Sequence, residues 1–421
     1  MRMLARHLSR QLKLPNYSTF NAPEAQLEHP AGRVPYTEAL TFLGGPTPEH
    51  RIPAYRTLTD ASQELDAAQL PHPITQALGV KMYQAMASLQ TLDTLCYEAQ
   101  RQGRMSFYLT STGEEATVVG SAAALDPQDM VFAQYREQGV LLWRGFTIRQ
   151  FADQLMGNAL EAGKGRQMPI HYGSRELCYQ TISSPLATQM PHAVGAAYAM
   201  KLSGASTVAV AYFGEGAASE GDAHAALQFA ATLAAPVLFI CRNNGYAIST
   251  PASEQYKGDG IAGRAAGYGM AAVRVDGGDA QAVYNAVAEA RRLALQGSQP
   301  VLVECMSYRA GHHSTSDDSS RYRTADEMRA WRARDPVSRF RGWLQGRGWW
   351  DEMQEQALRV ATRKEVMDAL DAAAAVPKPP VSCLFTDVYK NMPGHLKAQM
   401  DETFEFVKRH PELVPLGVPV A

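Results

Sequence analysis

The sequence predicts an α/β fold with a parallel, doubly wound sheet, an N-terminal arm and a helical C-terminal extension. The main observation is a set of four short apolar runs, at residues 207–213, 236–241, 271–276 and 300–305. Such continuous runs suit strands that are buried on both faces, as in a parallel sheet. Helical stretches rich in small residues separate the first two runs and the last two, where a parallel sheet needs crossover helices. Charged helical patterns after Arg323 predict the C-terminal extension.

The first twenty residues form a basic amphipathic pattern, and the first acidic residue is Glu24. The pattern consists of Arg2, Arg6, Arg10 and Lys13 beside Leu4, Leu8 and Leu12. It is typical of a mitochondrial targeting peptide and equally of an arm that docks on a partner subunit. Residues 21–60 are rich in Pro and Gly and lack periodicity, which predicts an extended arm.

Apolar residues recur at helical spacing from Ile74 to Gln102, and Gly103 supplies a stop signal. We therefore expect three regions: an N-terminal arm over 1–60, an α/β domain over 61–325 and a helical C-terminal extension over 326–421. In one interpretation, residues 1–20 of the arm are a targeting peptide.

Composition excludes several classes of protein. The 421 residues carry 40 Lys+Arg and 42 Asp+Glu, and this net charge of −2 favours neither a nucleic-acid nor a polyanion partner. No apolar run approaches the ~18 residues that span a bilayer. The 5 cysteines are scattered and form no C-x-x-C pair. This pattern fits a reducing compartment and argues against a disulfide framework or a structural zinc site.

Polar residues follow two neighbouring predicted strands. Gly214-Glu215-Gly216 follows the strand that ends at Phe213, and the next strand ends at Asn243-Asn244. Ligands of open parallel sheets bind at the carboxyl ends of the strands, and glycines let the backbone approach a phosphate. Glu215, Asn244 and the carbonyl of Tyr246 suit a Mg²⁺ ion that also holds a diphosphate.

The motif also resembles two other kinds of sequence. Gly214-x-Gly216-x-x-Ser219 is close to a dinucleotide fingerprint, but Ser219 replaces the third small residue and Asn-Asn stands where the ribose-binding acid is expected. The chain contains no G-x-x-x-x-G-K-[ST] sequence, which excludes a P-loop. A lone Gly-x-Gly is usually only a tight turn, but the pairing of Glu215 with Asn244 across a strand–helix–strand unit favours the diphosphate site.

The segment from Gly214-Glu215-Gly216 to Asn243-Asn244 resembles the thiamine diphosphate motif of the 2-oxo acid dehydrogenases. Six further segments resemble the α subunits of the branched-chain 2-oxo acid dehydrogenases: QYREQGVLL, GKGRQMP, SSPLATQ, RNNGYAISTP, SEQYKGDGIA and YRAGHHSTSDDSSRYR. The resemblance covers nearly all of the chain from about residue 50 onward. Many thiamine enzymes carry Asp at the position of Glu215, whereas the branched-chain α subunits commonly carry Glu.

The resemblance implies a thiamine diphosphate-binding fold and the role of 3-methyl-2-oxobutanoate dehydrogenase. That role is oxidative decarboxylation of branched-chain 2-oxo acids and reductive acylation of the lipoyl groups of an acyltransferase core. A self-contained thiamine enzyme needs two α/β domains, and the single core here implies a β subunit in an α2β2 heterotetramer. The implied location is the mitochondrial matrix, with the bacterial cytoplasm as the alternative.

Two alternatives to this function stay open. The first is the same role in a pyruvate or acetoin dehydrogenase complex, which the long match over 311–323 disfavours. The second is a nucleotide-binding or catalytically silent partner subunit, and the joint presence of Glu215, Arg242, Asn244 and His313 disfavours it.

The resemblance also implies roles for individual residues. Glu215, Asn244 and the Tyr246 carbonyl would bind Mg²⁺, and a structural K⁺ would be bound by Ser183, Thr188, Gln189 and the Pro185 carbonyl. His313 is the implied catalytic residue. The other implied cofactor contacts are Tyr135, Arg136, Ser184, Leu186, Gly214, Gly216, Ala217, Arg242 and Ile248.

Ser314 matches the regulatory position that a kinase phosphorylates and a phosphatase restores. A phosphate there would add about −2 charge beside a bound diphosphate. The family's second phosphorylation position falls on Thr324, a departure that speaks against double-site regulation.

Overall fold

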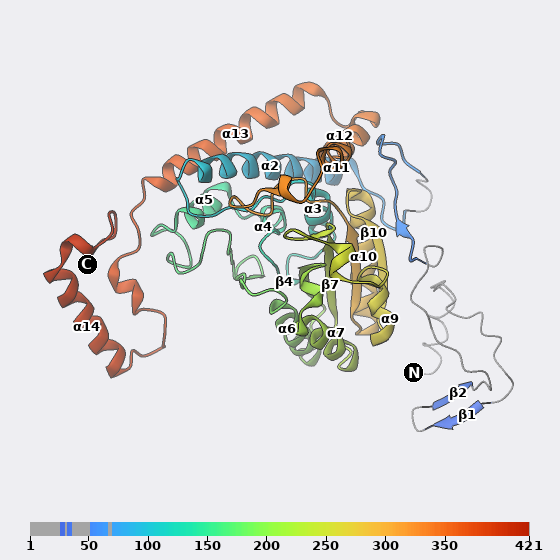
Figure 1. Cartoon of the computed structure of the whole chain (residues 1–421), viewed down its shortest axis with the longest axis horizontal. Helices are drawn as coiled ribbons and strands as arrows, with labels where there is room; N and C mark the ends of the chain where they lie inside the picture. Colours follow the sequence, from blue (N-terminus) through green and yellow to red (C-terminus); the bar gives the residue numbers. More distant parts are fainter. Residues whose placement is uncertain (1–25, 30–31, 36–50, 66–69, 421) are drawn as a thin grey trace. The chain divides into compact units, whose positions relative to one another are not determined.

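The computed structural model describes residues 26–29, 32–35, 51–65 and 70–420 (Figure 1). The chain divides into two compact units, Met1–Pro53 and Ala54–Ala421. In the first unit β1 (Gln26–His29) and β2 (Gly32–Pro35) form an antiparallel hairpin. The basic pattern of residues 1–20 lies outside the described residues.

The second unit is built on a seven-stranded sheet in which every neighbouring pair is parallel. In spatial order the strands are β3 (Ala54–Tyr55), β10 (Ala271–Asp276), β11 (Val301–Met306), β7 (Val237–Asn243), β6 (Ala209–Gly214), β4 (Met130–Phe132) and β5 (Tyr179–Gln180). The four apolar runs of the sequence form β6, β7, β10 and β11, so the prediction of a parallel α/β sheet is confirmed.

Successive residues of the central strands face opposite layers of helices, because side chains alternate along a strand. In β6, Val210 and Tyr212 pack in one apolar cluster, and Ala211 and Phe213 pack in the other. All four side chains are buried. Burial on both faces explains why these strands are continuous apolar runs in the sequence.

Helices cover both faces of the sheet (Figure 1). The first layer contains α2 (Gln76–Arg101), α3 (Glu115–Ala123), α4 (Gln138–Arg144), α5 (Ile148–Met156), α10 (Ala280–Gly297), α12 (Pro336–Gly346) and α13 (Glu352–Ala374). The second contains α6 (Gln189–Ser203), α7 (Gly221–Thr232) and α9 (Ala265–Tyr268). Shorter elements are β8 (Tyr246–Ala247), β9 (Thr250–Pro251), α8 (Ala252–Gln255) and α11 (Ala325–Arg332), and α14 (Gly394–Arg409) lies near the C-terminus.

Helix α2 illustrates how local signals set the boundaries. The Thr75 side chain accepts a hydrogen bond from the Leu78 backbone N–H at 3.3 Å and caps the N-terminus. The helix stops before Gly103, whose φ of +77° only glycine adopts at low cost. No helix in the described part of the chain is both long and apolar enough to cross a membrane.

The structure differs from the sequence prediction between residues 21 and 60. The prediction placed no element there, whereas the structure has the β1–β2 hairpin and the edge strand β3. The segment after β3 is anchored by Asp279, whose carboxylate accepts hydrogen bonds from the backbone N–H groups of Thr57 and Leu58, both at 2.7 Å. These partners are more than 200 positions apart, so no local pattern reveals them. The domain boundaries at 60 and 325 stay a prediction.

Two phenylalanines test the account of the core. Phe239 in β7 is fully buried, whereas Phe229 in α7 is 57% exposed. We expect Phe239→Ala to lower the free energy of unfolding by about 3–5 kcal/mol, through lost burial and a cavity. Phe229→Ala should change it by about 0.5 kcal/mol. Urea unfolding followed by circular dichroism measures both, and equal effects would contradict the assignment of β7 to the sheet centre.

Candidate active site

The carboxyl ends of β6 and β7 bring Glu215 and Asn244 together. The two strands pair in parallel with Gly214 opposite Arg242, so the residues that follow emerge at the same edge of the sheet. Glu215 Oε2 accepts a hydrogen bond from the Asn244 backbone N–H at 3.3 Å. The adjacency expected from the sequence is therefore present in the fold.

Glu215 is a buried carboxylate with an unused oxygen. Glu215 is 1% exposed, and its Oε1 atom has no hydrogen-bond partner among the described residues. Burial, with a smaller contribution from the charge of Glu114, raises the pKa of Glu215 to about 7. A buried oxygen of this kind is costly unless a cation or a proton satisfies it.

The Asn244 side chain is oriented by two neighbours. Its Nδ2 donates to Glu114 Oε1 at 3.2 Å, and its Oδ1 accepts from the Tyr246 N–H at 3.2 Å. Tyr246 is itself held by its hydroxyl, which donates to Glu327 Oε1 at 2.9 Å. These contacts fix the turn that carries the amide and carbonyl oxygens beside Glu215.

Gly216 allows two segments to approach closely. A Cβ added there would lie 2.7 Å from the Cβ of Ala247 in β8, a distance that real side chains do not reach. The N–H of Gly214 donates to Gln134 Oε1 at 3.0 Å, which ties the β6 end to the loop after β4. Packing against Ala247 therefore requires glycine at position 216, and the Gly-x-Gly turn also suits a phosphate.

The described residues contain no group of three or more His, Cys, Asp or Glu side chains arranged to hold a metal ion. A metal here would instead take one carboxylate together with amide and carbonyl oxygens. Such hard oxygen donors, with positions left for phosphate oxygens, are the set that Mg²⁺ prefers. The unpaired oxygen of Glu215 and the close approach at Gly216 both fit a metal-bound diphosphate.

Arg242 is engaged within the chain. Its Nη1 donates to Glu114 Oε1 at 3.0 Å, and its Nε pairs with Glu137 Oε1. All three side chains are buried, and buried charges must be paired. Although burial opposes it, the charges of Arg242 and Arg136 lower the pKa of Glu114. Arg242 thus connects two acids and presents at most part of its guanidinium to a ligand.

Sequence reasoning missed Glu114 and Glu137. Glu114 Oε1 also accepts from the Ser307 hydroxyl at 3.3 Å, and its Oε2 has no partner among the described residues. Glu137 Oε2 accepts from the Gln134 N–H at 2.7 Å. The available signal for Glu137 was its position directly after Tyr135-Arg136, within a segment that carried the family resemblance.

Burial and two neighbouring arginines set the protonation of His313. The Nη2 atom of Arg136 lies 3.0 Å from His313 Nδ1, and Nη1 of Arg309 lies 3.4 Å from it. Since arginine only donates, Nδ1 is the acceptor and Nε2 carries the proton. Burial, then Arg136 and Arg309, lower the pKa of His313 to about 3. His313 is therefore a neutral imidazole with one N–H to donate.

Arg309, also missed from the sequence, holds an unusual backbone conformation. Its Nη2 donates to the Ile248 carbonyl at 2.7 Å, and Ile248 has a φ of +56°. A β-branched residue in the left-handed region is strained and needs support from its surroundings. The Ile248 side chain is 55% exposed, so the strained turn presents an apolar group outward near the end of β7.

The turn before α6 gathers oxygen atoms. Thr188 Oγ1 lies 3.0 Å from Ser183 Oγ and 3.1 Å from the Pro185 carbonyl. The amide nitrogen of Gln189 donates to the Tyr212 carbonyl at 2.8 Å, whereas its buried Oε1 has no partner among the described residues. The four groups that the resemblance assigned to K⁺ thus belong to one turn. Leu186, in the same turn, is exposed.

A family model described as "Dehydrogenase E1 component" matches residues 83–382. The chain belongs to this family. The protein named 2-oxoisovalerate dehydrogenase subunit alpha, mitochondrial, from Homo sapiens is 50% identical over 413 residues, which cover 98% of this chain and 92% of that protein. Its namesake from Bos taurus is 52% identical over 398 residues, 94% of this chain and 87% of that protein. The subunit alpha 2 from Arabidopsis thaliana is 49% identical over 395 residues, 94% of this chain and 83% of that protein.

E1 components depend on thiamine diphosphate, so the chain belongs to a thiamine diphosphate-dependent family. The seven-stranded parallel sheet is the thiamine diphosphate-binding fold that the sequence predicted.

The Ser314 loop of this E1 component is ordered by hydrogen bonds. The His313 N–H donates to Asp317 Oδ2 at 2.7 Å, and the Tyr322 hydroxyl donates to the same oxygen at 2.6 Å. Ser314 is buried, with its Oγ 3.1 Å from Ser316 Oγ. Thr324, at the second family position, caps α11 by accepting from the Glu327 N–H at 3.1 Å.

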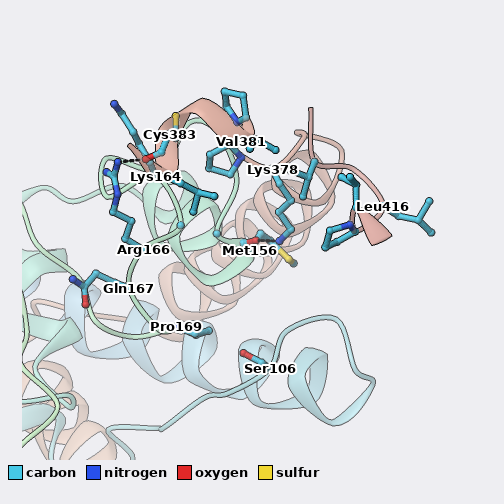
Figure 2. A pocket seen from close by; sticks show the side chains of 18 of the residues that line it. Ser106, Met156, Lys164, Arg166, Gln167, Pro169, Lys378, Val381, Cys383 and Leu416 are labelled. Carbon is cyan, nitrogen blue, oxygen red and sulfur yellow. Dashed lines mark hydrogen bonds between the residues drawn. The ribbon is translucent and has the colours of Figure 1, made fainter. Parts of the chain in front are cut away.

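A cavity of about 1190 Å³ lies elsewhere, between the ends of α2 and α5 and the C-terminal segment. Figure 2 shows part of its lining, where Arg166 donates to the Cys383 carbonyl and Lys378 to the Met156 carbonyl. The lining contains none of the residues that we assign to the cofactor or to a metal. The cofactor site therefore follows the strand ends and not this cavity.

Asp93 in α2 supports the loop that carries Arg136 through a chain of hydrogen bonds. Its carboxylate accepts from the Tyr108 hydroxyl at 2.8 Å and from the Ser111 N–H at 2.5 Å. The Ser111 hydroxyl then donates to the Arg136 carbonyl at 3.1 Å. Burial raises the pKa of Asp93 from 3.8 to about 6.

This shift predicts a pH dependence of stability. The folded chain keeps a proton on Asp93 that the unfolded chain releases, so this group's contribution to stability falls as the pH rises through about 4 to 6. Relative to Asp93→Asn, the wild-type free energy of unfolding should fall by about 2 kcal/mol between about pH 4 and pH 7. Urea titrations measure it, with the exposed Asp401→Asn as control. Parallel pH profiles of wild type and Asp93→Asn would contradict it.

Proposed function

We propose that this chain is the α subunit of a branched-chain 2-oxo acid dehydrogenase. It would carry out thiamine diphosphate-dependent oxidative decarboxylation of substrates such as 3-methyl-2-oxobutanoate and acylate the lipoyl groups of an acyltransferase core. The observation that carries the proposal is the buried, unpaired Glu215 oxygen beside Asn244 at the carboxyl edge of the sheet. The printed names of the relatives supply the substrate class.

The metal would be held by Glu215, the Asn244 amide oxygen and the Tyr246 carbonyl. Support comes from the orientation of Asn244, whose nitrogen is committed to Glu114 so that its oxygen faces the turn. Glu215 must lose its proton to bind the ion. The positive charge of the ion then stabilises the carboxylate, whose negative charge burial alone disfavours.

The diphosphate would lie against Gly214, Gly216 and Ala217 and receive positive charge from Arg136 and Arg242. Tyr135 lies beside His313 in an edge-to-face contact with ring centroids 6.0 Å apart. The Nε2–H of His313 would hydrogen-bond an anionic oxygen without carrying a charge itself.

The rings would contact Ser184, Leu186 and Ile248, since Leu186 and Ile248 expose apolar side chains. When bound, the cofactor supplies the carbon that adds to the 2-oxo acid and accepts the electrons released on decarboxylation. The chain contributes binding, orientation and a largely dry, charged edge.

A K⁺ ion would be bound by Ser183, Thr188, Gln189 and the Pro185 carbonyl. The unpaired, buried Oε1 of Gln189 supports this, because a cation would satisfy an oxygen that the chain leaves without a partner. Its role would be to fix the turn that carries Ser184 and Leu186.

A β subunit would complete the site, because the described residues form a single α/β sheet and the cofactor needs two domains. We place the α2β2 assembly in the mitochondrial matrix, following the names of the relatives and the basic pattern of residues 1–20. A kinase and a phosphatase would act on Ser314, next to His313, where a phosphate would repel the diphosphate.

Glu215→Gln tests the metal site. We expect Mg²⁺-dependent affinity for thiamine diphosphate to fall by at least about 100-fold, since losing even an outer-shell partner of a metal ligand costs about 10–100-fold. Titration calorimetry of the α2β2 assembly measures it. The matched control is Glu220→Gln, an exposed carboxylate five residues later. Unchanged affinity in Glu215→Gln would refute the assignment.

A reconstitution experiment tests the shared site and the substrate class together. The purified chain alone should decarboxylate no 2-oxo acid, and addition of its β partner should give turnover of 3-methyl-2-oxobutanoate in preference to pyruvate. Decarboxylation by the single chain would contradict the shared site. A preference for pyruvate would favour the alternative complex.

A further inference from the structure

His171 lies directly behind the turn that carries the predicted ring contacts. It belongs to the loop after α5, is 6% exposed, and places its Nε2 atom 2.5 Å from Ser184 Oγ. Ser184 sits between Ser183 and Pro185, both of which we assign to the K⁺ turn. His171 thus touches the one polar side chain among the predicted ring contacts.

The tautomer of His171 follows from its other nitrogen. Nδ1 lies 3.1 Å from the Pro169 carbonyl oxygen, and a carbonyl can only accept a hydrogen bond. Nδ1 therefore carries the proton, and in the neutral ring Nε2 is an acceptor. The Ser184 hydroxyl must then donate to Nε2, so its proton points toward His171.

The loop that carries His171 is held rigidly. Gln154 of α5 accepts from the Ile170 N–H at 3.0 Å and donates to the Met168 carbonyl at 2.8 Å. Ile170 is fully buried and has a φ of +68°, a strained conformation for a β-branched residue. Such strain persists only where the surroundings over-determine it, and it recurs at functional sites.

We propose that His171 is a positioning residue that directs the Ser184 hydroxyl, so that Ser184 meets the cofactor as a hydrogen-bond acceptor. With its proton committed to His171, the Ser184 oxygen offers only lone pairs to a ligand. It would accept a hydrogen bond from a donor group on the cofactor rings, such as an amino group. It would not pair with an unprotonated ring nitrogen, which is itself an acceptor. This inference deepens the proposed function and rests on it.

The experiment uses the assembled α2β2 enzyme with Mg²⁺ and compares His171→Asn, His171→Gln, Ser184→Ala and the double variant His171→Asn/Ser184→Ala. Asn retains a donor for the Pro169 carbonyl but is too short to reach Ser184. Gln is long enough to offer its Oε1 to the Ser184 hydroxyl. The exposed His395→Asn is the control. Calorimetry gives the thiamine diphosphate dissociation constant, and kcat and the thermal midpoint are measured in parallel.

We expect His171→Asn to weaken cofactor affinity by about fivefold to tenfold, in line with the loss of one directed hydrogen bond. His171→Gln should restore affinity to within about twofold of wild type, and the double variant should match Ser184→Ala. Unchanged affinity in His171→Asn, or multiplicative losses in the double variant, would overturn the inference and leave His171 with a packing role. A wild-type assembly that binds no thiamine diphosphate would instead contradict the proposed function itself.

Discussion

The structure depends on the parallel pairing of β6 with β7, which sets Glu215 beside Asn244. Neither residue alone indicates a metal site, since a single carboxylate or amide at a strand end is common. Placed together in a dry edge, they leave an oxygen that no described residue satisfies. A buried oxygen of this kind requires a cation or a proton, and Gly216 leaves the backbone beside it free of a side chain.

The buried charges around this pair are arranged in two groups. Arg242 pairs with both Glu114 and Glu137 at the strand ends, so two carboxylates share one guanidinium, and Glu114 Oε2 has no partner among the described residues. His313, in contrast, is kept neutral by burial and by Arg136 and Arg309, which converge on its Nδ1 atom. One side of the edge is therefore prepared for a cation and the other for an anion, which is the division that a metal-bound diphosphate needs.

The sequence predicted the elements whose signals are local. The strands β6, β7, β10 and β11 are continuous apolar runs because both faces are buried, and Glu215 and Asn244 follow from where two of these runs end. It did not predict Glu114 or Arg309, because their roles depend on distant partners. Glu114 is 128 positions from the Arg242 that it binds. The edge strand β3 was missed for the same reason, since its partner β10 lies far along the chain.

A crystal structure of the α2β2 assembly with thiamine diphosphate, and with Mn²⁺ in place of Mg²⁺, would show directly whether Glu215 and Asn244 bind the metal. The anomalous signal of manganese locates the ion independently of the protein density. We expect one peak, bonded to Glu215 Oε1, Asn244 Oδ1 and the Tyr246 carbonyl at about 2.0–2.4 Å. A peak at any other place, or a cofactor bound away from the β6 and β7 ends, would contradict it.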